Sequence, residues 1–144
     1  MKLVRFGPKG REKPGIVDKT GVLRDLSGVI SDITPETLAA GAIAKIKKVK
    51  PETLPAAPKK VRIGPCVGRV RNFIAIGLNY ADHARETNSP IPKEPIVFNK
   101  APSCIVGPYD DVQIPRKSKK TDWEVELAVI IGKGGSYIPE DKAL

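Results

Sequence analysis

Glycine and proline interrupt this chain at intervals too short for long helices. The chain holds 13 glycines and 14 prolines among its 144 residues. Proline breaks a helix interior, and glycine weakens helices and strands alike. We therefore expect short strands and short helices joined by frequent turns. A chain of this length can still bury a hydrophobic core of ordinary size.

Residues 1–28 are expected to form short strands joined by tight turns. MKLVRF (1–6) and the apolar parts of GIVDKTGVLRDLSG (15–28) have the composition and the length of strands. Between them, the sequence Asp-Lys-Thr-Gly at 18–21 suits a hairpin connection. The chain therefore begins with a small antiparallel sheet.

A helix is expected over residues 34–49. Thr34 suits the N-cap, and the proline that follows it suits the first helical position. The apolar residues of this segment form one stripe at helical spacing: Leu38, Ala42, Ile46 and Val49. A proline-rich connector follows at 50–65. We therefore predict a small N-terminal α/β domain at 1–60 and a second domain at 61–144.

The second domain is predicted to be rich in strands. A short helix is expected in NYADHARET (79–87). The strand candidates are FIAIG (73–77), PIVFNK (95–100), DVQIP (111–115) and DWEVELAVIIG (122–132). Many strands with one short helix indicate a mixed β roll or sandwich, and the fold class of the whole chain is then α+β.

The longest of these strands carries carboxylates on the face where apolar residues follow. Glu124 and Glu126 share this face with Asp122, and Ala128 and Ile130 continue it. One interpretation is an exposed edge strand whose carboxylates pair with the lysines at 119 and 120. The other is a cation between the carboxylates, which would remove their mutual repulsion. Carboxylate oxygens favour a hard ion, Mg²⁺, with Mn²⁺ or Ca²⁺ as alternatives.

His83 is the only histidine of the sequence, and it stands three residues before Glu86. On a helix these two side chains are neighbours. A carboxylate beside an imidazole fixes its tautomer and stabilises the imidazolium, as a general base requires. An ordinary surface pair is the alternative interpretation, and the spacing alone favours it.

Three further features contain residue types that occur in sites. Lys100 follows a predicted strand, where it receives a substrate carboxylate or is simply a solvated strand end. IGKGGS (131–136) lacks the phosphate-loop pattern and is interpreted as a turn. Cys66 and Cys104 lie far apart without metal-ligand spacing, and we interpret both as reduced thiols of a cytoplasmic protein.

The formal net charge is +9, and basic residues cluster at 45–50, 58–63 and 115–122. Such clusters occur in nucleic-acid-binding proteins. Aromatic residues make up only 5% of the chain and are not interleaved with these clusters, which argues against that function. No apolar run approaches the roughly 18 residues of a membrane span, and the N-terminus lacks a signal-peptide pattern. We therefore expect a cytoplasmic protein without a membrane partner.

Three motifs in this order resemble the fumarylacetoacetate hydrolase family. They are GPCVGRVRNFIAIGLNYADHARE (64–86), PIVFNKAPSCIVGPYDDVQIPR (95–116) and TDWEVELAVIIGK (121–133). The resemblance covers about residues 64–138, and residues 1–60 are similar to the small N-terminal domain of many members. It implies a mixed β roll, of which this chain holds the first part, and a homodimer.

The resemblance also implies a divalent metal ion held by three acidic residues, two of which map onto Glu124 and Glu126. A His–Glu pair on a short helix that closes over the site maps onto His83 and Glu86. Lys100 matches a position that lines the substrate pocket. The implied reaction is cleavage of the C–C bond of a 2,4-diketo acid, either an acylpyruvate or a 2,4-diketo-3-deoxy sugar acid. Water activated by the histidine, with an enolate stabilised by the metal, would give pyruvate and a second acid.

Other activities of the family leave the reaction open. Ureidoglycolate lyases, hydroxy-dienedioate isomerases and oxaloacetate decarboxylases share the same enolate or carbonyl chemistry. The third metal ligand of the family, an aspartate, lies on a later strand of longer chains. We therefore expect this chain to be a truncated N-terminal portion that is inactive alone and needs the missing C-terminal half. The rival interpretation is an inactive domain that serves in assembly or binding.

Overall fold

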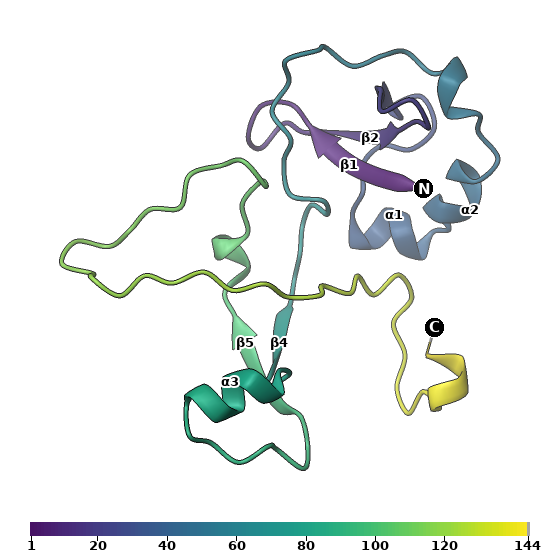
Figure 1. Cartoon of the computed structure of the whole chain (residues 1–144). Coiled ribbons are helices and arrows are strands. Elements are labelled where there is room, and N and C mark those ends of the chain that lie inside the picture. The colour runs from purple at the N-terminus through teal and green to yellow at the C-terminus, as the bar shows by residue number, and fades with distance from the viewer. Residues whose placement is uncertain (144) are drawn as a thin grey trace. The chain divides into compact units, whose positions relative to one another are not determined.

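The computed structural model describes residues 1–143, which form two compact units (Figure 1). The main unit contains Met1–Arg69 together with the chain from Val106 onward. The hairpin unit contains Val70–Ile105 and interrupts the main unit along the sequence. The boundary that the sequence indicates at residue 60 stays a prediction.

A three-stranded antiparallel sheet organises the main unit. Its strands are β1 (Lys2–Phe6), β2 (Lys13–Val17) and β3 (Leu23–Asp25), in the order β1-β2-β3. The register of the first pair joins Leu3 to Ile16 and Phe6 to Lys13. Side chains alternate between the two faces of a strand, so this register places Phe6 and Ile16 on opposite faces of the sheet, and each is buried, at 4% exposure. The strands predicted in residues 1–28 are confirmed.

The turn between β2 and β3 is held by a buried carboxylate. Asp18 Oδ1 accepts hydrogen bonds from the amide of Thr20 at 2.9 Å and from the amide of Val22 at 3.0 Å. Arg24 Nε donates to Asp18 Oδ2 at 2.8 Å. The hydroxyl of Thr20 also donates to Asp18 Oδ1, at 2.6 Å. This hydrogen bond above all, together with the others, holds the pKa of Asp18 below its usual range against the opposite effect of burial. The predicted hairpin turn at 18–21 is confirmed, and aspartate is suited to it because its side chain bonds the backbone two residues on.

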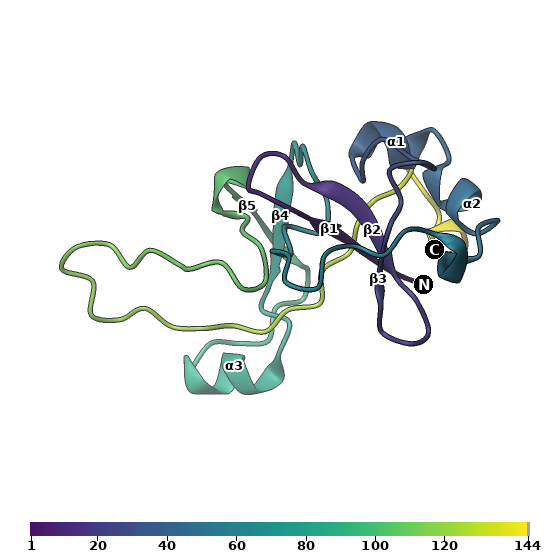
Figure 2. The same ribbon diagram turned by 90° about the horizontal axis from the view of Figure 1, so that it is seen from above.

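The helix predicted over 34–49 is in fact two short helices, α1 (Pro35–Ala39) and α2 (Ala42–Ile46). Gly41 separates them, with a left-handed φ of 81° that residues with side chains avoid inside helices. The prediction of a single helix is therefore wrong, whereas Thr34 is confirmed as the N-cap of α1. Both helices lie along one side of the β1–β2 pair in two perpendicular views (Figures 1 and 2).

The main unit has a hydrophobic core to which its strands, helices and loops all contribute. Leu26, just after β3, has 0% of its surface exposed. The buried apolar side chains of this unit are Phe6, Ile16, Leu26, Ile30, Ile33, Ala42, Ile46 and Val67. Burying one such side chain contributes about 1.5–3 kcal/mol relative to leaving it exposed. This core gives the main unit its own source of stability.

The hairpin unit contains two paired strands, one α-helix and a short 3₁₀ helix at Pro102–Cys104. β4 (Phe73–Gly77) and β5 (Ile96–Lys100) pair antiparallel, with Phe73 opposite Lys100 and Gly77 opposite Ile96. α3 (Ala81–Glu86) lies between them in the sequence. These two strands and the helix predicted over 79–87 are confirmed. No helix in residues 1–143 is long and apolar enough to cross a membrane.

Two predicted strands, 111–115 and 122–132, are not strands in the structure. A strand exists through hydrogen bonds to a neighbouring strand, and in residues 1–143 no strand pairs with either of these two segments. The alternating apolar residues of the second segment are exposed, with Trp123 at 83% and Leu127 at 89%. The sequence of this segment therefore has the alternation of a strand, but no strand of residues 1–143 pairs with it.

Candidate functional site

The helix α3 places its polar residues on an exposed face. Ala84 is the buried residue of this helix, at 2% exposure, and the residues on either side of it, His83 and Arg85, are exposed. The hydroxyl of Thr87 donates to the carbonyl of His83 at 2.8 Å and closes the last turn. The backbone around His83 is thus fixed, while its imidazole faces outward.

Glu86 follows His83 by three residues on the same helix. No hydrogen bond or ion pair connects their side chains in the part of the chain that the structure describes. The ion pair of this helix is formed instead by Arg85 with Asp82, also three residues apart. The orientation of the imidazole by Glu86 therefore stays a prediction.

Lys100 ends β5 in the same unit as His83. Its ammonium nitrogen lies 6.0 Å from the centre of the Phe98 ring, at the outer limit of a cation–π contact. The side chain of Lys100 is half-buried at the end of the strand. It therefore holds a positive charge at the end of the ribbon that leads back to the main unit.

Glu124 and Glu126 belong to the main unit, in the extended segment 121–131. Their oxygens are the donors that a hard divalent cation prefers, so in chemical type they fit Mg²⁺. Among residues 1–143, no group of three or more His, Cys, Asp or Glu residues is arranged to hold a metal ion. The two carboxylates are therefore ligands of the right chemical type for Mg²⁺, but the described residues bring no third ligand to them.

The five predicted site residues thus divide between the two units. His83, Glu86 and Lys100 lie in the hairpin unit, and Glu124 and Glu126 lie in the main unit. The structure brings the first three into one small element, a β ribbon with its connecting helix. The roles assigned to all five stay predictions.

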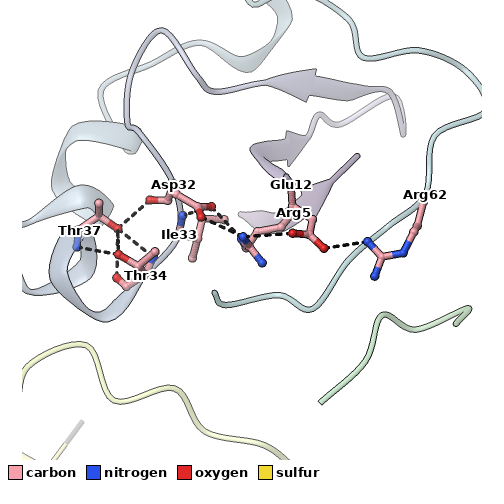
Figure 3. Close-up of polar contacts among 7 residues, drawn as sticks. All are labelled: Arg5, Glu12, Asp32, Ile33, Thr34, Thr37 and Arg62. Carbon is pink, nitrogen blue, oxygen red and sulfur yellow. Dashed lines mark hydrogen bonds and ion pairs between the residues drawn. The ribbon is translucent and has the colours of Figure 1, made fainter. Parts of the chain in front are cut away.

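Five alternating charges form a row in the main unit, and Figure 3 shows four of them, Asp32, Arg5, Glu12 and Arg62. Arg5 donates to the carboxylate of Asp32 from two nitrogens, at 2.7 and 2.9 Å. Its other neighbour is Glu12, at 3.6 Å. Arg62 donates to Glu12 at 2.8 Å and to Asp110 Oδ1 at 2.7 Å. We call the row Asp32–Arg5–Glu12–Arg62–Asp110 the ion row.

The inner members of the ion row are buried. The side chains of Arg5 and Glu12 are 10% and 6% exposed, respectively. Burial would raise the pKa of Glu12, but hydrogen bonds from the backbone and from Arg62 outweigh it and lower this pKa. Arg62 is also the main cause that lowers the pKa of Asp110 to about 2, with a further hydrogen bond from the Gly107 amide. All three carboxylates are therefore paired with a guanidinium.

Residues 72–144 match the family model of the fumarylacetoacetate (FAA) hydrolase C-terminal domain. This match covers just over half of the chain, and the chain belongs to the fumarylacetoacetate hydrolase family. The predicted family is thereby confirmed.

Full-length relatives and solved structures agree with this assignment. The chain is 53% identical over all 144 residues to a "putative hydrolase" of Burkholderia ambifaria and 52% identical to one of Burkholderia cenocepacia. It spans 51% of the length of each, about half of these curated relatives.

Two solved structures are similar to the described chain. A fumarylacetoacetate hydrolase from psychrophilic Exiguobacterium antarcticum is 27% identical, with a TM-score of 0.54. A "putative HpcE protein" from Mycobacterium smegmatis is 26% identical, with a TM-score of 0.57. Each likeness covers 78% of this chain and 40% of the other. The α+β chain therefore forms part of a fumarylacetoacetate hydrolase-like fold, as predicted.

Proposed function

We propose that the protein takes part in the metal-dependent cleavage of a C–C bond in a 2,4-diketo acid, giving pyruvate and a second acid. The observation that carries this proposal is the exposed His83 on α3, within the segment that matches the hydrolase family. The names of the relatives support a hydrolase in general terms. The substrate class and the role of each residue are part of what we propose.

His83 is the general base of this proposal. A neutral imidazole with an exposed nitrogen can take a proton from water, and the hydroxide then attacks the 4-keto carbon. Glu86, three residues on, stabilises the imidazolium once its side chain turns toward His83. Lys100 attracts the carboxylate of the 2-oxo acid by its positive charge. The same helix and ribbon thus provide a proton acceptor and an anchor.

Glu124 and Glu126 would hold the divalent cation, Mg²⁺ or alternatively Mn²⁺ or Ca²⁺. A bound cation supplies positive charge where negative charge develops on the oxygen of the breaking diketone. Further ligands would come from polypeptide outside the described residues, because two carboxylates rarely suffice for such an ion. Cation binding and assembly are therefore coupled in this proposal.

The partner of this proposal is a polypeptide equivalent to the second half of the longer relatives, and the complete protein is a cytoplasmic homodimer. The exposed apolar side chains of the hairpin ribbon support it, with Ile74 at 50%, Val97 at 63% and Phe98 at 47% exposure. An isolated two-stranded ribbon is marginally stable in water and needs further strands or a helix to cover it. Added strands would cover these side chains and give the 121–131 segment a partner.

A pyruvate-release assay with an acylpyruvate tests the proposal. The chain is assayed with and without the second half of the Burkholderia ambifaria relative, each with Mg²⁺ and with a chelator. We expect Mg²⁺-dependent pyruvate only from the mixture. His83→Ala should lower kcat by about 10²–10⁴-fold while leaving Mg²⁺ bound. Glu126→Gln should abolish the Mg²⁺ response, whereas the control Glu140→Gln, also an exposed carboxylate, should not.

Three outcomes of the assay would change the proposal. Wild-type turnover in His83→Ala would remove the base assignment. Turnover without pyruvate would favour the lyase, isomerase or decarboxylase activities of the family. No turnover from the mixture, with weak Mg²⁺ affinity, would favour the rival, a domain that serves in assembly or binding. That rival is supported by the shortage of metal ligands among residues 1–143.

A further inference from the structure

The net positive charge of the chain resides in its first 69 residues. These residues hold 15 lysines and arginines against 6 aspartates and glutamates, a net charge of +9, whereas residues 70–144 hold 10 of each and are neutral. Residues 1–69 all belong to the main unit. Three of their arginines, Arg5, Arg24 and Arg62, are paired with carboxylates. The excess of positive charge therefore lies mostly on lysines, all of which are exposed in this part of the chain.

A groove of about 700 Å³ lies in the main unit, between the β2–β3 turn and the end of α2. Volumes of roughly 300–1,000 Å³ are typical of sites for small molecules. The apolar side chains that line the groove come from β2, from α2 and from the residues after α2: Ile16, Val17, Ile46, Val49 and Pro51. The groove therefore has the size and the apolar lining that the body of a small organic molecule requires.

The fold of the main unit fixes the walls of this groove. Ile16 and Ile46 are 4% and 2% exposed, so the lining is continuous with the hydrophobic core. The turn at 18–21 is fixed by the hydrogen bonds that Asp18 accepts from two backbone amides. The groove is thus formed before a ligand arrives. A ligand would therefore lose little affinity to the ordering of the chain.

The charges that line the groove leave an excess of positive charge. Lys19 forms an ion pair with Glu52 at 3.6 Å. Asp18 is buried in its turn and paired with an arginine at 2.8 Å. Lys2 and Lys47 also line the groove, and neither forms an ion pair within residues 1–143. An anion that enters the groove therefore meets two uncompensated positive charges.

These two lysines reach the groove from different elements. Lys2 is the first residue of β1 and lies opposite Val17 in the register of the β1–β2 pair. Lys47 follows the buried Ile46 at the end of α2. The lysines at 45–50 alone would be an ordinary solvated surface. The approach of Lys2 and Lys47 to one apolar groove is what indicates a site.

We propose that the groove binds a small organic anion, with Lys2 and Lys47 at its negative group and the apolar lining against its body. A carboxylate, sulfonate or phosphate group suits two ammonium groups, because each is a compact charge with three donors. None of the described residues that line the groove is aromatic, so it offers no stacking surface for the bases of a nucleic acid. None of the five predicted site residues lines it, and the inference does not depend on the proposed function.

The fluorescent anion 8-anilinonaphthalene-1-sulfonate tests the site, because it joins an apolar ring system to a sulfonate. The probe is titrated into the whole chain and followed by the chemical shifts of the backbone amides. Residue-specific shifts are needed because this probe also binds other exposed apolar surface. We expect the largest saturable shifts at amides of the groove, namely those of Val17, Thr20, Gly21, Lys47 and Val49.

Two charge reversals separate a site from attraction by the overall charge. Lys47→Glu should weaken binding at these amides about tenfold, because a repelling charge replaces an attracting one. Lys60→Glu is the matched control, since it changes the net charge equally at an exposed residue that does not line the groove. It should change the affinity by less than about twofold at an ionic strength of about 0.15 M, which screens distant surface charges. The amide spectrum verifies that each variant is folded.

Three results would overturn the proposal. They are an absence of saturable shifts, largest shifts at residues outside the groove, and equal weakening by Lys47→Glu and Lys60→Glu. The last result would mean that only the overall charge attracts the anion. The measurement uses neither a diketo acid nor a metal ion, so a failure of the proposed function leaves its result unchanged.

Discussion

Replacing Gly107 by alanine should destabilise the main unit by an amount that its packing allows us to estimate. The new methyl group would lie 2.3 Å from the Ile63 carbonyl oxygen, whereas ordinary contacts begin at 3.4 Å. The two backbone segments would have to separate by about 1 Å, which disturbs the hydrogen bond from the Gly107 amide to Asp110. Overpacking of this kind costs about 1–3 kcal/mol.

Urea unfolding followed by far-ultraviolet circular dichroism measures this loss. The midpoint should fall with little change in the slope, because the surface exposed on unfolding is almost the same. Gly28→Ala is the matched control, since a Cβ there meets nothing within 4 Å and its backbone is not left-handed. We expect the control to change the free energy of unfolding by less than about 0.5 kcal/mol. Equal midpoints for the two variants would refute the close packing of Gly107 against Ile63.

Two further predictions concern the main unit. As the pH falls from 3.8, the usual pKa of an aspartate, towards about 2, the folded pKa of Asp110, the chain should lose stability. A lowered folded pKa contributes stability that is present above the unfolded pKa and is lost on acidification. A constant urea midpoint from pH 5 to pH 2 would contradict the pairing of Asp110 with Arg62. Leu26→Ala should lower the free energy of unfolding by about 2–5 kcal/mol, because Leu26 is fully buried. A loss below about 1 kcal/mol in the same urea experiment would argue against this burial.

Local signals in the sequence predicted the elements whose determinants are local. Thr34 caps a helix through hydrogen bonds within its first turn, and Asp18 fixes a hairpin through amides up to four residues away. Gly41 lies inside the single helix predicted over 34–49, although its left-handed backbone separates the two helices found there. The pattern at 121–131 has the period of a strand, but a strand also requires a neighbour, which periodicity does not report.

The ion row was missed because its members are scattered along the sequence. Arg62 and Asp110 are 48 residues apart, and Arg5 and Asp32 are 27 apart. Each looks like an ordinary surface charge when only its neighbours in the sequence are considered. The sequence signal that remains is indirect, namely the glycines at 64, 68 and 107, where a Cβ atom would collide with members of the row or with the backbone beside it. A glycine outside a turn is the kind of residue that indicates such close approach.

The two units differ in how much apolar surface they bury, and the unit with the smaller core carries three of the five predicted site residues. The main unit buries Leu26 and Ile46 in a core of its own. The hairpin unit carries His83 and Lys100 but leaves Val97 and Phe98 of its ribbon 63% and 47% exposed. A two-stranded ribbon is marginally stable alone, and in the proposed function a further polypeptide covers it. In the proposed function, the polypeptide that covers the ribbon also completes the metal site. The affinity for the metal ion should therefore be higher in the assembled protein than in this chain alone.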